Sequence, residues 1–277
     1  MIDKNKIPPE LQSSCKCVPI DPDWPISGPL EALELLEEWE QLEGGPEPLT
    51  AEHVSRNLIG GHIQMLTHSH HYEYADLKRF GVEQLYQKSR STKYVSIGWH
   101  LAGRYEYDVA LIAELECLGW PSVKLIDFGA ACWIQAIFYA NKGLQVDIVN
   151  QTLDSDCNRF GRWLAQKKGL LGRINEYSSK DIDQIGEYDI IYAMDVFEHI
   201  PPLEDGTPGW IPVATRLLKA LKPGGIWQVN SPFGEESGVP HPVSSHEVHY
   251  TSPISQSEWN VQQGLVQEGY LWRKPPL

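Results

Sequence analysis

The segment Asp127–Trp133, with the sequence DFGAACW, follows the apolar run VKLI and begins like a strand-to-helix loop that lies against a cofactor. Gly129 fits such a loop, because a residue without a side chain lets a ligand approach the backbone. The two later positions at which such loops usually carry glycine hold Ala131 and Trp133. The single methyl group of Ala131 is tolerable there if its φ stays negative. The bulky indole of Trp133 either belongs to the core or faces a ligand.

Polar residues also follow the other apolar runs of the second half of the chain. In a doubly wound parallel sheet, ligands bind outside the carboxyl ends of the strands, where the strand order reverses. The residues just after each expected strand therefore predict the site, and they are Asp127, Gly129, Asn150, Ser178, Ser179, Met194 and Asp195. We expect them to meet at one edge of the sheet.

An acid–base group follows the fourth expected strand in the sequence DVFEHIPP. A histidine at this position, His199, can take a proton from a hydroxyl or an amine near neutral pH. The alternative is structural, with Glu198 and His199 tying the fourth strand to its neighbours. Asp195 and His199 are candidate catalytic residues, and Tyr105 is a third candidate from the preceding helical region.

The elements that must position these residues change in kind near residue 121. Hydrophobic spacing and capping residues predict helices over 29–44, 50–68, 72–90 and 103–120. Expected strands at 123–128, 144–150, 172–177, 188–195, 226–232 and 270–274 then alternate with expected helices at 133–143, 154–169, 210–225 and 255–269. This alternation predicts an α/β domain over 121–277 with a doubly wound, mostly parallel sheet. A helical lid or substrate-selecting region is expected over 29–120, and an extended arm over 1–28.

Composition excludes several classes of function. The 277-residue chain has a formal net charge of −14, so its surface repels phosphate backbones, and nucleic acid is not an expected partner. No apolar run reaches the roughly 18 residues of a membrane span, and the N-terminal sequence lacks the apolar core of a secretory signal. Five cysteines without such a signal fit a reducing compartment. We expect a cytoplasmic protein without a membrane partner.

Three further stretches fall at spacings typical of one family. They are VKLIDFGA at the first strand, EYDIIYAMDVFEHIPP at the fourth, and ATRLLKALKPGGIWQVNSP approaching the fifth. Over residues 123–232 the chain resembles the class I S-adenosylmethionine-dependent methyltransferases. The resemblance implies a Rossmann-like fold, S-adenosylmethionine as the cofactor and a small-molecule acceptor, and a homodimer is one assembly consistent with it. It does not extend to the helical front.

The resemblance also assigns expected roles to residues. In the family the second strand usually ends in an acid that binds both ribose hydroxyls, and Asn150 stands there. The third strand usually provides an acid for the adenine amine, where this chain has Ser178 or Ser179. Asp127, Gly129, Ala131, Met194 and Asp195 complete the expected cofactor site. Trp133 would either lie in the core or place an aromatic face beside the sulfonium.

Metal binding is the alternative reading of three clusters. Cys15 and Cys17 are too close in sequence for a typical structural zinc pair, and no second pair follows. The histidines of THSHHYEY and PHPVSSHEVHY could bind a metal. We favour a solvated polar face for the first segment and a loop beside the cofactor for the second. These histidines are His68, His70, His71, His241, His246 and His249. No metal is expected.

The leading hypothesis is in-line methyl transfer to a small molecule. The expected walls of the acceptor site are Trp99, His100, Tyr105, Trp133 and His249. One alternative is an enzyme that cyclises the aminobutyrate chain of S-adenosylmethionine and releases methylthioadenosine. Another is a non-catalytic binding protein with this fold. The family usually closes its sheet with a two-stranded hairpin, and because the chain ends soon after 270–274, we expect the final strand to be missing or to be supplied from elsewhere.

Overall fold

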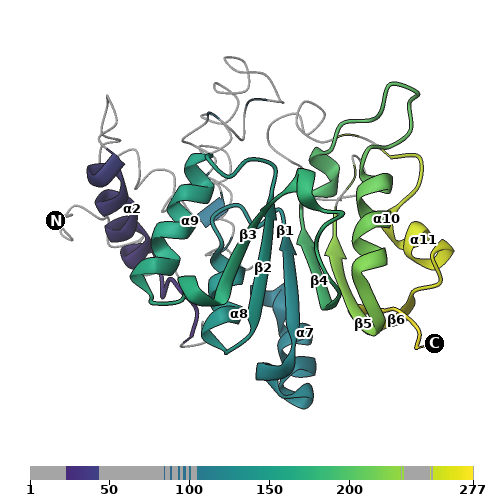
Figure 1. The fold of residues 1–277 in the computed structure, drawn as a ribbon, viewed down its shortest axis with the longest axis horizontal. Helices are drawn as coiled ribbons and strands as arrows, with labels where there is room; N and C mark the ends of the chain where they lie inside the picture. Colours follow the sequence, from purple (N-terminus) through teal and green to yellow (C-terminus); the bar gives the residue numbers. More distant parts are fainter. Residues whose placement is uncertain are drawn as a thin grey trace, which may run out of the picture.

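The computed structural model describes residues 23–43, 105–231 and 252–276, together with the single residues Gln84, Lys88, Lys93, Ser96, Ile97, His100, Phe233 and Tyr250. The described part is a twisted sheet with helices packed on both faces (Figure 1). The expected helices over 50–68 and 72–90 lie largely outside the described residues, as does most of the expected arm over 1–28.

The sheet has seven strands in the order β3-β2-β1-β4-β5-β7-β6. Strands β1 to β5 pair in parallel, and β7 pairs antiparallel with β5 and β6. The strands are β1 Lys124–Phe128, β2 Gln145–Asn150, β3 Ile174–Ser178, β4 Tyr188–Met194, β5 Leu221–Asn230, β6 Val266–Glu268 and β7 Leu271–Arg273. The strand order reverses at β1, which lies between β2 and β4, and this confirms the expected doubly wound α/β fold.

Within the described residues, six longer helices accompany the sheet. They are α2 Pro29–Glu43, α7 Tyr105–Leu118, α8 Ile134–Asn141, α9 Asp156–Lys167, α10 Trp210–Ala220 and α11 Gln256–Gln262. In Figure 1, α2 lies beside α9 at one side of the molecule, and α10 and α11 lie together at the other. None of the helices that the structure describes is long and apolar enough to cross a membrane.

The two faces of the sheet bury two separate hydrophobic clusters. Side chains alternate along each strand, so Leu125 and Ile126 of β1 enter different clusters. The first cluster joins the sheet to α2, α7, α8 and α9, and the second joins it to α10 and α11. The described parts of the helical front therefore share one core with the parallel sheet.

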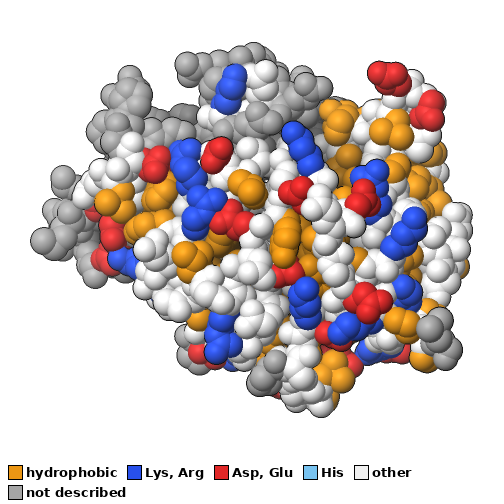
Figure 2. Space-filling view, in the orientation of Figure 1, with side chains coloured by type: hydrophobic (Ala, Val, Ile, Leu, Met, Phe, Trp, Pro, Cys, Tyr) orange, Lys and Arg blue, Asp and Glu red, His pale blue; other side chains and the backbone are white. Residues whose placement is uncertain are grey.

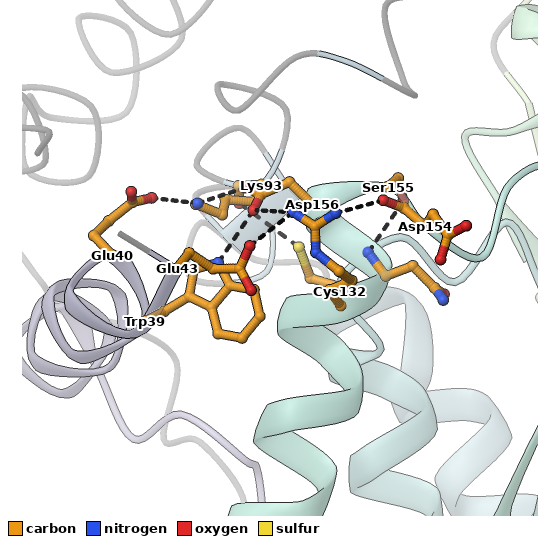
Figure 3. Close-up of polar contacts among 10 residues, drawn as sticks. Trp39, Glu40, Glu43, Lys93, Cys132, Asp154, Ser155 and Asp156 are labelled. Carbon is orange, nitrogen blue, oxygen red and sulfur yellow. Dashed lines mark hydrogen bonds and ion pairs between the residues drawn. The ribbon is translucent and has the colours of Figure 1, made fainter. Parts of the chain in front are cut away.

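A buried ion cluster ties α2 to the first turn of α9 (Figure 3). The ammonium of Lys93, whose side chain has no exposed surface, pairs with Glu40 of α2 and lies 2.5 Å from Oδ2 of Asp156 in α9. The indole of Trp39 donates a hydrogen bond to Oδ1 of the same aspartate at 3.2 Å. Lys93 is thus held between two helices that are far apart in sequence.

The end of the expected arm is packed into the same core. Trp24 and Ile26 are buried, and the ring of Trp24 lies 4.9 Å from that of Phe138 in α8. Residues 23–28 therefore form part of the folded body. Burial of their aromatic and aliphatic side chains is favourable in free energy, and an extended arm in solvent would not provide it.

The C-terminal hairpin is complete, so the expectation of a missing strand was wrong. The expected helix over 255–269 ends at Gln262, and the chain then forms β6, turns at Gly269 with a φ of 64°, and returns as β7. Gln267 pairs with Trp272 across this turn. Strands of three residues are too short for an alternating pattern to reveal them.

The surface in view mixes charges of both signs (Figure 2). Many form exposed ion pairs, such as Lys167 with Glu38 at 2.8 Å and Lys222 with Asp189 at 2.8 Å. Exposed pairs of this kind contribute little stability each, so the fold depends chiefly on its two cores.

Candidate functional site

Strained backbone marks the carboxyl ends of β1 and β4. After β1, φ is 79° at Gly129, 43° at Ala131 and 62° at Trp133, and after β4 it is 54° at Asp195. Among the non-glycine residues that the structure describes, Ala131, Trp133 and Asp195 are the ones with positive φ. Each such residue costs about 1 kcal/mol or more, and strain of this kind concentrates at functional sites.

The loop after β1 keeps a glycine-type backbone without its later glycines. The condition of a negative φ at Ala131, under which its methyl group would be tolerable, is therefore not met. The turn closes through a hydrogen bond from the Trp133 N–H to the Ala130 carbonyl at 2.7 Å, and α8 begins at the next residue, so the chain has no room for an extended conformation. At Gly129, a Cβ atom would lie 2.5 Å from Cγ2 of Val196, so this loop touches the turn after β4.

The side chain of Trp133 lies in the core, where it neither blocks nor lines a ligand site. It has no exposed surface, and its indole N–H donates to Oδ1 of Asn158 in α9 at 2.8 Å. The ring covers Gly161, where a Cβ would lie 2.5 Å from the indole Cγ. An aromatic face beside the sulfonium is thus incompatible with this conformation, and the core interpretation is the correct one of the two.

Asn150, at the end of β2, is held by the loop on one side and by α9 on the other. Its Oδ1 accepts from the Ala131 N–H at 3.3 Å, and its Nδ2 donates to Oδ1 of Asn158 at 2.6 Å. The side chain is nearly buried, but its carbonyl oxygen and amide nitrogen each keep the capacity for one further hydrogen bond. Asn158 was not recognised from the sequence, because nothing in a helix-forming segment distinguishes it.

The end of β3 lies beside Asn150. Asn150 is paired with Ser178 across the two strands, and Ser178 and Ser179 are half-buried. The Ser178 hydroxyl accepts from the Lys180 N–H at 3.3 Å. Across β1, Met194 is buried at the end of β4, and the N–H of Asp195 donates to the Asn230 carbonyl at 2.8 Å. The expected cofactor residues thus converge on one edge of the sheet.

Asp127 belongs to a buried polar group below the loop. It is 3% exposed at the end of β1, on the face covered by α7 and α8. Burial raises the pKa of the Tyr139 phenol well above its ordinary value, and the nearby carboxylates of Asp108 and Asp127 raise it further. The Tyr139 hydroxyl donates to Oδ1 of Asp108 in α7 at 2.8 Å. Asp108 and Tyr139 were missed because each stands within an apolar helical pattern.

Several solved structures resemble this chain, although no family model and no curated protein matches it. A sarcosine dimethylglycine methyltransferase from Galdieria sulphuraria is 22% identical over 58% of this chain and 62% of its own, with a TM-score of 0.45. An O-methyltransferase family protein from Burkholderia thailandensis is 13% identical over 77% of this chain and 72% of its own, at 0.46. Phosphoethanolamine N-methyltransferase 2 from Haemonchus contortus is 18% identical over 76% of this chain and 44% of its own, with a TM-score of 0.41.

The described strand order is that of a doubly wound α/β fold. All three identities lie below one quarter and all three TM-scores below 0.5, and this chain spans less than two thirds of the length of the Galdieria chain. Activity, cofactor and acceptor are therefore argued from the residues of this chain.

The acid–base candidates follow β4. His199 ends a short helical turn, η6 Phe197–His199, and is half-buried. Glu198 is fully buried, and its carbonyl accepts the Tyr250 N–H at 2.7 Å. The Phe197 N–H donates to the Ser231 hydroxyl at 3.1 Å, which ties the turn to the end of β5. This part of the turn is structural, and His199 remains a candidate for proton transfer.

The expected acceptor walls are only partly within the described residues. Tyr105 begins α7, but its side chain is not among the described parts of the structure. Trp99 and His249 also lie outside the described residues. His100 is 3% exposed, and the centroid of its ring lies 6.5 Å from that of Trp24. Among the described residues, His, Cys, Asp and Glu form no group of three or more that could hold a metal. Cys15, Cys17 and the histidines of both His-rich segments lie outside that part.

Proposed function

We propose that this protein is an S-adenosylmethionine-dependent methyltransferase acting on a small molecule. The observation that carries the proposal is the backbone after β1, which has positive φ at Gly129, Ala131 and Trp133. Two of these residues hold, at an energetic cost, a conformation that glycine adopts freely. The shape of the loop backbone, rather than its side chains, is therefore what this site requires.

The residues at this edge of the sheet fit the cofactor. Gly129 lets the loop pack against Val196 of the turn after β4, and the buried indole of Trp133 leaves the ligand side of the loop clear. Asn150 would accept one ribose hydroxyl with its carbonyl oxygen and donate to the other with its free amide hydrogen. Ser178 and Ser179 would face the adenine side from β3. The amide lacks the charge of the usual acid, which costs about 1 kcal/mol or more in binding.

S-adenosylmethionine supplies a methyl group that its sulfonium makes electrophilic. The protein must then orient an acceptor in line with that methyl group and exclude water. Asp195, held at a φ of 54°, would fix the turn after β4 beside the cofactor. His199 would remove the proton from a hydroxyl or amine acceptor as the new bond forms. A net charge of −14 favours a neutral or cationic acceptor over an anionic one.

Calorimetric titration with S-adenosylmethionine and S-adenosylhomocysteine tests the proposal. We expect micromolar binding by the wild type and at least a roughly tenfold loss in Gly129→Ala, because the new methyl group would meet Val196 in a strained backbone. Gly206→Ala is the matched control, since Gly206 also has a positive φ of 84° but open space around it. Absence of binding by the wild type, or unchanged binding by Gly129→Ala, would overturn the proposal.

The cyclisation alternative loses one of the two observations that motivated it, the altered loop, while the many aromatic residues of the chain remain. It required Trp133 to reshape the methionine side of the site, and the indole is instead buried against α9. A non-catalytic binding protein remains the rival, because the acids usual at the ends of β2 and β3 are replaced. The same titration separates the two, since a scaffold without a cofactor site would give no heat with either ligand.

A further inference from the structure

The side-chain amide of Asn158 in α9 has all four of its hydrogen bonds made by the protein. Its Oδ1 accepts from the indole of Trp133 at 2.8 Å and from Nδ2 of Asn150 at 2.6 Å. Its Nδ2 donates to the Leu153 carbonyl at 2.9 Å and to Oε2 of Glu176 at 3.0 Å. An asparagine amide has two donor hydrogens and one carbonyl with two lone pairs, so no capacity is left over.

This arrangement fixes which way the amide of Asn158 points. Rotating it by half a turn would set its NH2 against two other donors, Trp133 and Asn150. It would also set its oxygen against the Leu153 carbonyl and the Glu176 carboxylate, which itself is held by Arg162 at 2.5 Å and 2.6 Å. Buried acceptors or donors that face each other lose their hydrogen bonds without compensation from water.

The fixed amide in turn decides what position 150 can be. An indole N–H only donates, so Trp133 requires an oxygen at 158, and that oxygen requires a donor at 150. Asparagine provides the donor. Aspartate, the residue type usual at this place in the family, would put two acceptor oxygens at the 2.6 Å separation now spanned by a hydrogen bond. The tryptophan at 133, where glycine is usual, and the asparagine at 150, where an acid is usual, are therefore chemically linked.

Gly161 completes the linkage. It lies three residues after Asn158 and hence on the same face of α9. The indole of Trp133 occupies the space that a Cβ would need, since its Cγ, Cδ1 and Cδ2 would all lie within 2.9 Å of that atom. A glycine in the interior of a helix is thus matched to a tryptophan in the loop, and the same face of α9 receives both the ring and its N–H.

We propose that Asn158 is a positioning residue that couples Trp133 to Asn150 and sets the ligand-binding orientation of the Asn150 amide. With Nδ2 held by Asn158, Asn150 presents its carbonyl oxygen to the Ala131 N–H and keeps one amide hydrogen and one lone pair for a ligand. The binding part of this inference rests on the proposed cofactor site. The coupling itself concerns the folded protein and does not depend on any ligand.

The coupling is tested by two double-mutant cycles read as thermal midpoints. Asn150→Asp in the wild type is expected to lower Tm by roughly 5 °C, because the carboxylate faces a carbonyl. In an Asn158→Ala background the same change should cost much less. Likewise Trp133→Phe, which removes the N–H and keeps a ring, should cost less in Asn158→Ala than in the wild type. Additive losses in both cycles would overturn the coupling.

The positioning role is tested by titrating the same variants with S-adenosylhomocysteine. Asn158→Ala should weaken binding by roughly tenfold, although Asn158 itself is buried and all of its hydrogen bonds are made within the protein. Leu164→Ala is the control: Leu164 is equally buried in the same helix but outside the network, so it should lose stability and keep its affinity. Equal affinity losses in both variants would show a merely structural role.

Asn150→Asp separates this inference from the proposed function. We expect it to bind the ligand less tightly than the wild type, and to regain affinity in combination with Asn158→Ala. An Asn150→Asp variant that binds as tightly as the wild type and keeps its Tm would overturn the inference while leaving the proposed function intact. A wild type that binds no ligand would overturn the proposed function and the positioning role, and the stability cycles would still decide the coupling.

Discussion

Ala131 holds a backbone conformation that an L-residue with a side chain adopts only at a cost. Its φ is 43°, and the residue is half-buried in the loop after β1. Ala131→Gly should therefore stabilise the protein, because relief of about 1–2 kcal/mol of strain outweighs the roughly 0.5–1 kcal/mol that glycine loses in chain entropy. The expected net gain is small, up to about 1 kcal/mol, and urea unfolding measures it.

Ala136→Gly is the matched control for this prediction. Ala136 is fully buried in the interior of α8, five residues further along, where alanine is the preferred residue. The same substitution there should destabilise by about 1 kcal/mol or more. A loss of stability in Ala131→Gly would contradict the strain argument, since it would mean that the methyl group contributes more by packing than the backbone loses.

The residues of the candidate site could be located from the sequence, but their orientations could not. The positions after each strand follow from periodicity, and Asn150 and Ser178 do lie side by side. The direction of the Trp133 indole depends on an asparagine and a glycine in α9, which are 25 and 28 residues away in sequence. No local pattern encodes that contact, and the positive φ at Ala131 follows from how the turn closes.

At the scale of elements, α2 and α9 are joined through a buried charge. Lys93 pairs with Glu40 and Asp156, and all three side chains are buried. Lys93→Met would leave the two carboxylates without this cation in a region of low dielectric. We expect the variant to lose about 3–5 kcal/mol of unfolding free energy, which urea unfolding would measure.

Lys88→Met provides the comparison for Lys93. Lys88 is exposed, and its ammonium bonds to the side chain of Gln84, so its replacement should change stability by less than about 0.5 kcal/mol. Equal effects of the two substitutions would mean that the buried cluster contributes nothing specific to the attachment of α2.

Long elements with strong periodicity were predictable, and short or locally ambiguous ones were not. The expected helices over 29–44, 103–120 and 154–169 correspond to α2, α7 and α9 with ends shifted by a few residues. The segment 210–225 was expected to remain helical to its glycines, but α10 ends at Ala220 and β5 begins at Leu221. There the backbone carbonyls of Leu218 and Leu221 accept from the ammonium of Lys274, at 3.1 Å and 2.5 Å, a contact between distant parts of the chain.

At the scale of the whole molecule, each face of the sheet contains a tyrosine whose hydroxyl is bonded to a buried carboxylate. Tyr139 donates to Asp108 on the face covered by α7 and α8, and Tyr188 of β4 donates to Asp147 of β2 at 2.5 Å. Burial, followed by the neighbouring carboxylate, raises the pKa of both phenols above the ordinary value. The protons on these two hydroxyls thus link the stability of both layers to alkaline pH.

The folded protein holds these two protons at a pH at which the unfolded chain releases them. Stability from both tyrosines is therefore fully present below about pH 10, the unfolded pKa, and falls as the pH rises above it, by roughly 1.4 kcal/mol per pH unit for each proton. Tyr139→Phe should flatten the decline, although it is less stable at neutral pH. Tyr270→Phe, with 89% of Tyr270 exposed, should leave the profile unchanged. Urea unfolding between about pH 8 and pH 11 measures this, and identical slopes in all three proteins would contradict the prediction.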